Sequence, residues 1–277
     1  MPLNSSGPIS IGGSTTGQSI NLELDRSATQ STNLNETAMR SLSGVASGTI
    51  SLSNFYGVGV PTNQLISRLE GWRYTGSGTV LTDYSGVGNS ANIINSPTWN
   101  GIGFRVSGTQ GLDFNKPMVA GKNEVTVAVF AAFVDQTSAS TPNMAIIDEA
   151  RGAYWQYSLY NSAFYTRDSS DTESRNNDLS GFATTISNLG TTKSSFITRY
   201  SVSGGFKNVT INKTNTFTNT TGILTLSTSS SSRFMKIGIA SDGIGFNGTI
   251  YAVYIYDRAI SDTELNSLHN YVMSKIS

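Results

Sequence analysis

The stretch "FNGTIYAVYIYDRAISDTELNSLHNYV", residues 246–272, decides the fold because an apolar strand is followed in it by a well-capped helix. Residues 249–256 are apolar or aromatic almost throughout, as expected for a strand that is buried on both faces. Ser261 and Glu264 have the spacing of a capping box, in which each side chain accepts a hydrogen bond from the backbone of the other residue. The stretch therefore predicts a strand and then a helix.

The predicted helix has a single apolar stripe. Leu265, Leu268 and Val272 follow one another at the i, i+3, i+7 spacing of one helix face. We expect this stripe to cover a margin or a face of a β-sheet. His269 is the chain's one histidine, and its place beside the stripe favours a solvated helix residue over a member of a Ser-His-Asp triad.

Other segments predict more strands. Three segments separated by polar intervals have the side-chain pattern of strands. Residues 124–134 are rich in β-branched and aromatic side chains, and the side chains of 194–202 and 233–241 alternate in type with period two. Charged residues make up 13% of the chain, about half of the roughly 25% usual in soluble domains. Short strands joined by polar turns favour a mainly β protein built as an antiparallel sandwich.

The composition also argues against several function classes. Lys and Arg total 18 and so do Asp and Glu, so no net charge would attract nucleic acid or an acidic membrane. The chain has no cysteine, which excludes disulfides and cysteine chemistry. The first residues, "MPLNSSGPIS", do not have the features of a secretory signal, and no run approaches the ~18 apolar residues that span a bilayer. We expect neither nucleic-acid binding nor membrane insertion.

The first 60 residues differ from the rest of the chain in their sequence pattern. "SGPISI" at 6–11 recurs as "SGTISL" at 47–52, and residues 33–44 predict one short helix with a capping box from Asn33 to Glu36. Residues 58–64, with Pro61, are interpreted as a linker. The predicted domains are therefore a small N-terminal module, 1–60, and a β domain, 61–277. The module has so few large apolar residues that we expect a neighbour to order it.

Both ends of the β domain resemble one known family. Residues 81–108 are similar to the opening "D-x-S-G-x-G-N … P-x-W … F-x-G" pattern of laminin G-like, concanavalin A-like jelly-roll domains. Residues 246–272 are similar to the closing "G-x-I-x-x-V-x-I-Y-D-R-A-L-S-x-x-E-I … Y" pattern of the same domains. The resemblance implies a concanavalin A-like jelly roll with a short C-terminal helix.

The N-terminal module resembles a different family. The two S-G-x-I-S-[IL] elements and the closing "FYG" at 55–57 look like the leader module of tailed-phage virion proteins, particularly those of marine and cyanobacterial phages. The resemblance implies a virion location, synthesis in the host cytoplasm, and partners among capsid or tail proteins and other copies of this chain. The leading hypothesis is a non-enzymatic capsid decoration or tail appendage for host adhesion, which could also contact host glycans. The alternatives are a free carbohydrate-binding lectin and a glycan hydrolase.

A hydrolase reading requires carboxylates that face each other. Some concanavalin A-like glycanases carry an E-x-D-x-x-E strand, in which the alternating Glu and Asp place two carboxylates on one face. The one E-x-D here is Glu23 and Asp25, with Ala28 at the last position. Asp148 and Glu149 are adjacent, so a strand would point them to opposite faces. No catalytic residue is predicted.

Two further site hypotheses concern a metal and a glycan. Asp83 and Asn89 could offer oxygen ligands to calcium, although Asp- and Asn-rich turns also form for backbone reasons alone. Exposed aromatic rings can stack on sugars, but rings in alternating positions of a strand can equally fill a sandwich core. The candidate glycan-binding residues are Trp72, Tyr74, Tyr154, Trp155 and Tyr157.

Overall fold

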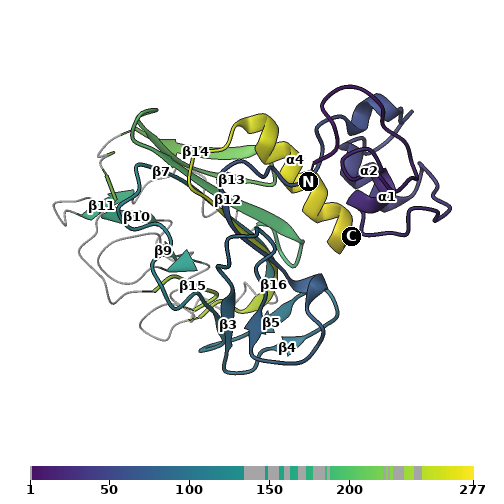
Figure 1. Ribbon diagram of the computed structural model, residues 1–277. Helices are drawn as coiled ribbons and strands as arrows, with labels where there is room; N and C mark the ends of the chain where they lie inside the picture. Colours follow the sequence, from purple (N-terminus) through teal and green to yellow (C-terminus); the bar gives the residue numbers. More distant parts are fainter. Residues whose placement is uncertain are drawn as a thin grey trace. The chain divides into compact units, whose positions relative to one another are not determined.

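A computed structural model describes residues 2–133, 147–148, 156–158, 163–167, 173–176, 185, 188–220, 223, 225–226, 234–239 and 245–277. The chain forms two compact units (Figure 1). Unit 1 comprises Met1–Asn63 and Ser261–Ser277, and unit 2 comprises Gln64–Ile260. Each unit is described separately below.

The large sheet of unit 2 is antiparallel and has the order β14-β13-β12-β7-β16-β5-β4, with β1 also paired to β16. The strands predicted at 124–134, 194–202 and 249–256 are confirmed as β7, β12 and β16, which lie side by side at its centre. The strands of this sheet are β1 (Leu65–Glu70), β4 (Thr98–Trp99), β5 (Phe104–Val106), β7 (Glu124–Phe133), β12 (Ser194–Ser201), β13 (Phe206–Ile211), β14 (Asn215–Asn219) and β16 (Gly248–Tyr256).

Among the described residues, unit 2 has two smaller antiparallel sheets. One has the order β2-β3-β6-β15-β8 and the other β11-β10-β9. The strand predicted at 233–241 appears as the two residues of β15. These strands are β2 (Val80–Leu81), β3 (Ala91–Ile94), β6 (Gly111–Asp113), β8 (Ile147–Asp148), β9 (Gln156–Ser158), β10 (Ala163–Arg167), β11 (Glu173–Asn176) and β15 (Lys236–Ile237).

One apolar core lies between the large sheet and the β2-β3-β6-β15-β8 sheet. Alternate residues of β7, such as Val127 and Val129, share a buried cluster with Leu112 of β6 and Ile237 of β15. Each large aliphatic side chain that is fully buried contributes about 1.5–3 kcal/mol. The predicted burial of β16 on both faces is confirmed, because every residue from Gly248 to Tyr256 is buried. The fold is therefore mainly β, as predicted, with antiparallel sheets packed as a sandwich.

Unit 1 contains short helices, and one of them matches the prediction at 33–44. The helices are α1 (Ile20–Glu23), α2 (Thr37–Ser43), the 3-10 helix η1 (Leu52–Phe55) and α4 (Asp262–Ile276). Gly44 ends α2 in the left-handed conformation, at φ 72°. The predicted capping box is wrong, because Glu36 is the N-cap without a side-chain cap. Asn33 instead forms a turn, in which its Oδ1 accepts from the backbone N–H of Asn35 at 2.9 Å.

The C-terminal helix α4 belongs to unit 1 and packs against α2. Its predicted capping box is confirmed by the reciprocal hydrogen bonds of Ser261 and Glu264. Ser267 accepts from the backbone N–H of Gly59 at 2.9 Å and lies 3.0 Å from the carbonyl oxygen of Gly59. Lys275 donates to a carbonyl oxygen at the end of α1. The helix thus completes the fold of the N-terminal module.

These contacts correct three expectations. The predicted domain 61–277 assigns the helix to the β domain, whereas the compact units assign it to unit 1. Residues 58–60 are buried, and Gly59 is hydrogen-bonded to Ser267 of α4. Residues 58–63 of the predicted linker at 58–64 therefore belong to unit 1. His269 is 9% exposed, so the interpretation of a solvated histidine is wrong. The apolar stripe is confirmed as buried.

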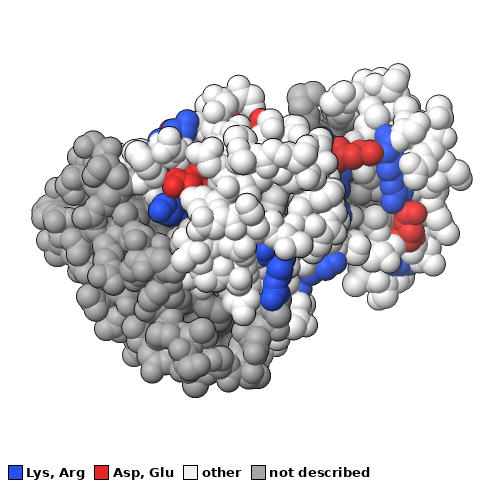
Figure 2. All heavy atoms as spheres, turned by 90° about the horizontal axis from the view of Figure 1, so that it is seen from below, with Lys and Arg blue, Asp and Glu red and all other residues white. Residues whose placement is uncertain are grey.

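The sandwich is an insertion in the sequence of unit 1. Its first and last strands, β1 and β16, pair with each other, and the backbone N–H of Asp257 donates to the carbonyl of Gln64 at 2.9 Å. An inserted domain whose ends are adjacent places little strain on the host unit. In the described part of the chain no helix has the length and hydropathy needed to cross a bilayer. On the face seen in Figure 2, the described Lys, Arg, Asp and Glu side chains are few and both signs are interspersed.

Candidate functional site

Unit 2 has a surface hollow of about 320 Å³, which we call the lysine hollow. One wall comes from β1, one from the loop between β2 and β3, and the rest from the segment that connects β6 to β7. Two of its seven lining residues are lysines and none is acidic. The lining residues are Ile66, Asn89, Lys116, Pro117, Met118, Ala120 and Lys122.

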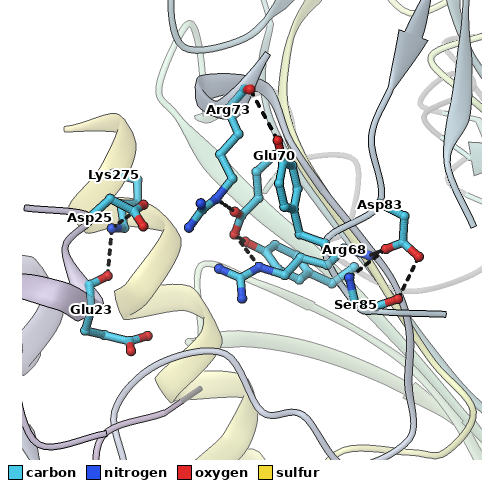
Figure 3. Close-up of polar contacts among 10 residues, drawn as sticks. Glu23, Asp25, Arg68, Glu70, Arg73, Asp83, Ser85 and Lys275 are labelled. Carbon is cyan, nitrogen blue, oxygen red and sulfur yellow. Dashed lines mark hydrogen bonds and ion pairs between the residues drawn. The ribbon is translucent and has the colours of Figure 1, made fainter. Parts of the chain in front are cut away.

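The loop that carries Asn89 is organised by one carboxylate. Asp83 Oδ1 accepts from the backbone N–H groups of Arg68 and Ser85, both at 2.8 Å (Figure 3). Asp83 Oδ2 accepts from Ser85 Oγ at 2.7 Å and from the backbone N–H groups of Gly88 and Asn89 at 2.9 and 2.7 Å. Burial alone would raise the pKa of this carboxyl, but the hydrogen bonds lower the pKa below its usual value.

Asn89 connects this loop to β1 and to a lysine. Its Nδ2 donates to the backbone carbonyl of Ile66 at 2.5 Å, and the backbone carbonyl oxygen of Asn89 accepts from Ser67 Oγ at 3.1 Å. The ammonium of Lys116 donates to Asn89 Oδ1. The side-chain amide therefore has a fixed orientation, with its oxygen toward the lysine.

The calcium hypothesis for Asp83 and Asn89 does not fit this geometry. Five N–H and O–H donors point at the two carboxylate oxygens of Asp83, and a lysine ammonium contacts the side-chain oxygen of Asn89. Calcium takes six or more oxygen ligands. To bind here, the ion would have to displace these N–H and O–H donors from the oxygens of Asp83 and Asn89. Within the described residues no group of three or more His, Cys, Asp or Glu could hold a metal. Asp83 instead stabilises the loop.

The two lysines of the hollow are on backbone segments that are hydrogen-bonded to the rest of the sandwich. The carbonyl of Lys116 accepts from the backbone N–H of Met235 at 3.0 Å. The carbonyl of Lys122 accepts from the backbone N–H of Leu226 at 3.1 Å. The Lys122 ammonium forms an ion pair with Asp257 Oδ1 at 2.7 Å. Sequence reasoning missed this site, because residues 66, 89 and 116–122 are brought together only by the tertiary fold.

Of the described glycan-binding candidates, Tyr74 packs against the core. The Tyr74 ring packs edge-on to Trp99, with 5.8 Å between ring centroids, and against Phe104 at 5.0 Å. The Tyr74 hydroxyl donates to the carbonyl of Gly78 at 2.6 Å. Trp72 is half-buried in the 3-10 helix η2 (Gly71–Arg73). For Tyr74, the alternative of core packing is therefore the better description.

The other three aromatic candidates cannot be placed in a site. Tyr154 and Trp155 lie outside the described residues. For Tyr157 the described part is the backbone, which belongs to β9 and pairs with Phe164 of β10.

The E-x-D pair of the N-terminal module is not on a strand. Glu23 is the last residue of α1, and Asp25 follows in the left-handed conformation at φ 57°. Asp25 Oδ2 lies 2.8 Å from the ammonium of Lys275, while the carbonyl oxygen of Glu23 accepts from the same ammonium at 2.7 Å (Figure 3). Asp148 is in β8, and Glu149 lies outside the described residues.

A buried carboxylate that sequence reasoning missed lies at the end of β1. Glu70 is fully buried and forms ion pairs with Arg68 and Arg73 (Figure 3). The hydroxyl of Tyr254 donates to Glu70 Oε1 at 2.7 Å. The Arg73 guanidinium also lies over the Tyr84 ring, 5.0 Å from its centroid. Two arginines and no water-accessible surface make this a structural network, since a hydrolytic carboxylate must reach its substrate.

No protein-family model matches the sequence, and a comparison with curated proteins gives no significant match. Solved structures do resemble it. The botulinum neurotoxin serotype D ligand-binding domain in complex with N-acetylneuraminic acid is 14% identical over 74% of this chain and 50% of that chain, with a TM-score of 0.51. The chain is an antiparallel β-sandwich protein. At this level of identity the likeness concerns the fold alone.

Two further neighbours come from enzymes. Domain 4 of AbnA, an extracellular arabinanase from Geobacillus stearothermophilus, in complex with arabinotriose, is 12% identical over 73% of this chain and 97% of that domain, with a TM-score of 0.51. Trypanosoma rangeli sialidase in complex with sialic acid is 15% identical over 83% of this chain, with a TM-score of 0.50. This chain covers 36% of the sialidase and half of the neurotoxin chain. The neighbours thus include a ligand-binding domain as well as domains of enzymes.

Proposed function

We propose that this chain is a non-enzymatic, lectin-like protein whose β-sandwich binds glycans in the lysine hollow, and that it is a structural component of a tailed-phage virion. The observation that carries the first part is the hollow itself. Its volume of about 320 Å³ suits a small ligand, and its lining combines apolar side chains with an amide and two ammonium groups. Ligand sites combine apolar surface with a few fixed polar groups, and in this hollow the polar part of the exposed lining is the larger.

The neighbouring structures support a glycan as the ligand. The neurotoxin domain holds N-acetylneuraminic acid, the arabinanase domain holds arabinotriose and the sialidase holds sialic acid. Three sandwiches of related fold, with sugars as ligands, make a sugar the first ligand class to test here. The likeness to these structures concerns the fold alone, so the assignment of the site to the lysine hollow rests on this chain's own residues.

Binding is favoured over hydrolysis by the chemistry of the hollow. Most glycosidases act through two carboxyl groups about 5–9.5 Å apart. The residues that line the hollow include no Asp or Glu. Glu70, which is buried elsewhere in the sandwich, is held by two arginines. We therefore propose a binding role, with hydrolysis as the alternative.

The virion role rests on the resemblance of the N-terminal module to phage leader modules. Unit 1 forms a compact unit with a core of its own, in which Ile20, Met39, Leu42 and Phe55 are fully buried. We propose that unit 1 docks on capsid or tail proteins, beside further copies of the chain, and that the inserted sandwich is displayed as a decoration or host-adhesion appendage. The insertion supports this division of roles, because the two ends of the sandwich leave from adjacent strands.

Glycan binding is tested with the full chain on a glycan microarray. We expect binding to at least one sugar class. Ala120→Gln places a larger side chain in the hollow and should weaken binding at least about tenfold, because a filled pocket excludes its ligand. Val80→Gln is the matched control, since Val80 is 45% exposed and does not line the hollow. Absence of any bound glycan would refute the lectin proposal, and release of reducing ends from a polysaccharide would favour the hydrolase.

The virion role is tested by gold-labelled antibody imaging of purified particles together with the copy number of this protein per particle. Label over the head at a high copy number would indicate a capsid decoration protein. Label at the tail at a low copy number would indicate an adhesion appendage. Particles without label would refute the virion role and would leave the lectin role standing.

A further inference from the structure

We propose that the lysine hollow selects acidic sugars, meaning sugars that carry a carboxylate or a sulfate group. This inference rests on the proposed glycan binding and names the class of sugar. The hollow concentrates positive charge in a chain whose formal net charge is zero. Its lining contributes Lys116 and Lys122 and no acidic residue. A neutral sugar needs no such pair of ammonium groups, whereas an anionic group gains charge-assisted hydrogen bonds from them.

Lys116 retains the capacity to bind an anion. Its ammonium donates to Asn89 Oδ1, which is a neutral acceptor, and within the described residues it has no carboxylate partner. An ammonium has three N–H donors, so one hydrogen bond to an amide leaves two for a ligand. The positive charge also remains uncompensated by that amide. A carboxylate or sulfate oxygen is the acceptor that such a group binds most strongly.

Lys122 is paired with a carboxylate, but that pair is open to competition. Its side chain is 22% exposed and that of Asp257 is 46% exposed. Ion pairs exposed to this extent are worth about 0–1 kcal/mol, so the ammonium can share its donors with an incoming anion at little cost. Asp257 reduces the positive charge beside the hollow without lining it. Its removal should therefore strengthen the binding of an acidic sugar.

The rest of the lining suits one sugar ring. Ile66 and Pro117 offer accessible apolar surface, on which the C–H groups of a pyranose can pack. The volume of about 320 Å³ is at the small end of ligand sites, which favours a single acidic residue over a long oligosaccharide. Asn89 is oriented by its bond to the carbonyl of Ile66, so part of the binding geometry is fixed before the ligand arrives.

The experiment measures the affinity of the full chain for four probes by isothermal titration calorimetry. The probes are 3′-sialyllactose, a galacturonic acid trisaccharide, 6-sulfated galactose and lactose. We expect at least one acidic probe to bind more tightly than lactose, and its affinity to fall as the salt concentration rises because ions screen the ammonium groups. Comparison of the three acidic probes distinguishes carboxylates from sulfates.

Three single substitutions and a control locate the interaction. Lys116→Gln and Lys122→Gln should each weaken the acidic probe by about fivefold, as expected for a charged hydrogen bond at a surface site. Asp257→Asn should strengthen it by about twofold to threefold, since it removes a competing carboxylate. A gain in affinity cannot result from misfolding. Lys213→Gln removes the same charge from the turn between β13 and β14 and should change nothing.

Each outcome has a definite meaning. If lactose binds as tightly as every acidic probe, the lectin proposal stands and acidic selectivity is refuted. If no probe binds and a glycan microarray is also blank, both proposals fail. If an acidic probe binds with the same affinity to the wild type and to the Lys116, Lys122 and Asp257 variants, the sugar binds elsewhere and the lysine hollow is refuted as the site.

Discussion

Lys207 should make the stability of the sandwich depend on pH. This lysine of β13 is 1% exposed, and burial lowers the pKa of its ammonium from 10.5 to about 8. In the unfolded chain the same group titrates near 10.5, so between pH 8 and 10.5 the unfolded state binds more protons than the folded state. The free energy of unfolding therefore rises with pH through this window. Below pH 8 both states are protonated and the full cost of burying the charge is present.

The substitution Lys207→Met measures this cost. A pKa difference of about 2.5 units corresponds to about 3 kcal/mol at 1.36 kcal/mol per unit. The variant should thus be more stable than the wild type by up to about 3 kcal/mol at pH 7, and the difference should fall to about 1 kcal/mol at pH 10. Guanidinium unfolding followed by tryptophan fluorescence at both pH values gives the two free energies.

A matched control separates burial from the loss of charge. Lys213→Met removes a lysine from the turn after β13, where the side chain is half-buried, and should change stability much less than Lys207→Met at pH 7. The reasoning is refuted if Lys207→Met does not stabilise the protein at pH 7. It is equally refuted if the difference from wild type is the same at pH 7 and pH 10.

Three more perturbations test separate parts of the fold. Glu70→Gln should destabilise the protein by about 3–5 kcal/mol, because it leaves two arginines beside a buried neutral group. Glu36→Gln, which removes a partly exposed ion pair of unit 1, is the comparison. Equal losses of stability for the two variants in urea unfolding would contradict the account. Asp83→Asn should destabilise the chain at pH 7, because the hydrogen bonds that lower the pKa of Asp83 stabilise its ionised form. The difference in the free energy of unfolding between wild type and variant should therefore shrink as the pH falls below 3.8. A difference that does not change with pH would count against this role of Asp83. Ser267→Ala removes the hydrogen bonds to Gly59 and should lower the free energy of unfolding by about 1 kcal/mol. It should also speed proteolysis of residues 1–60 but not of the sandwich. Unchanged proteolysis would show that α4 does not hold the N-terminal module.

The sequence predicted the elements whose signals are local. The apolar run at 249–256, the strands at 124–134 and 194–202 and the Ser261–Glu264 capping box are all confirmed, because side-chain periodicity and capping depend on neighbouring residues. The Asn33–Glu36 capping box was wrong, since a similar spacing of polar residues also occurs in a turn that precedes a helix. Spacing alone does not distinguish these two arrangements.

Features that depend on distant residues could not be predicted in the same way. The C-terminal helix completes unit 1 through hydrogen bonds between residues more than two hundred positions apart, such as Gly59 and Ser267. His269 was expected to be solvated because an isolated helix exposes the residue beside its stripe, whereas the tertiary structure buries it. Asp83 and Asn89, the candidate calcium ligands, have other partners in the structure. Their role is to hold a loop and to accept a hydrogen bond from Lys116.

The most direct test of the central claim is NMR chemical-shift mapping of the isotope-labelled full chain during titration with 3′-sialyllactose. The account predicts saturable shifts that are largest for the amides of Asn89, Lys116 and Lys122, which lie around the lysine hollow. Saturable shifts confined to other parts of the sandwich, for example around Trp72 and Tyr74, would contradict the assignment of the site. No shift with this sugar, with the galacturonic acid trisaccharide or with 6-sulfated galactose would contradict acidic-glycan binding itself.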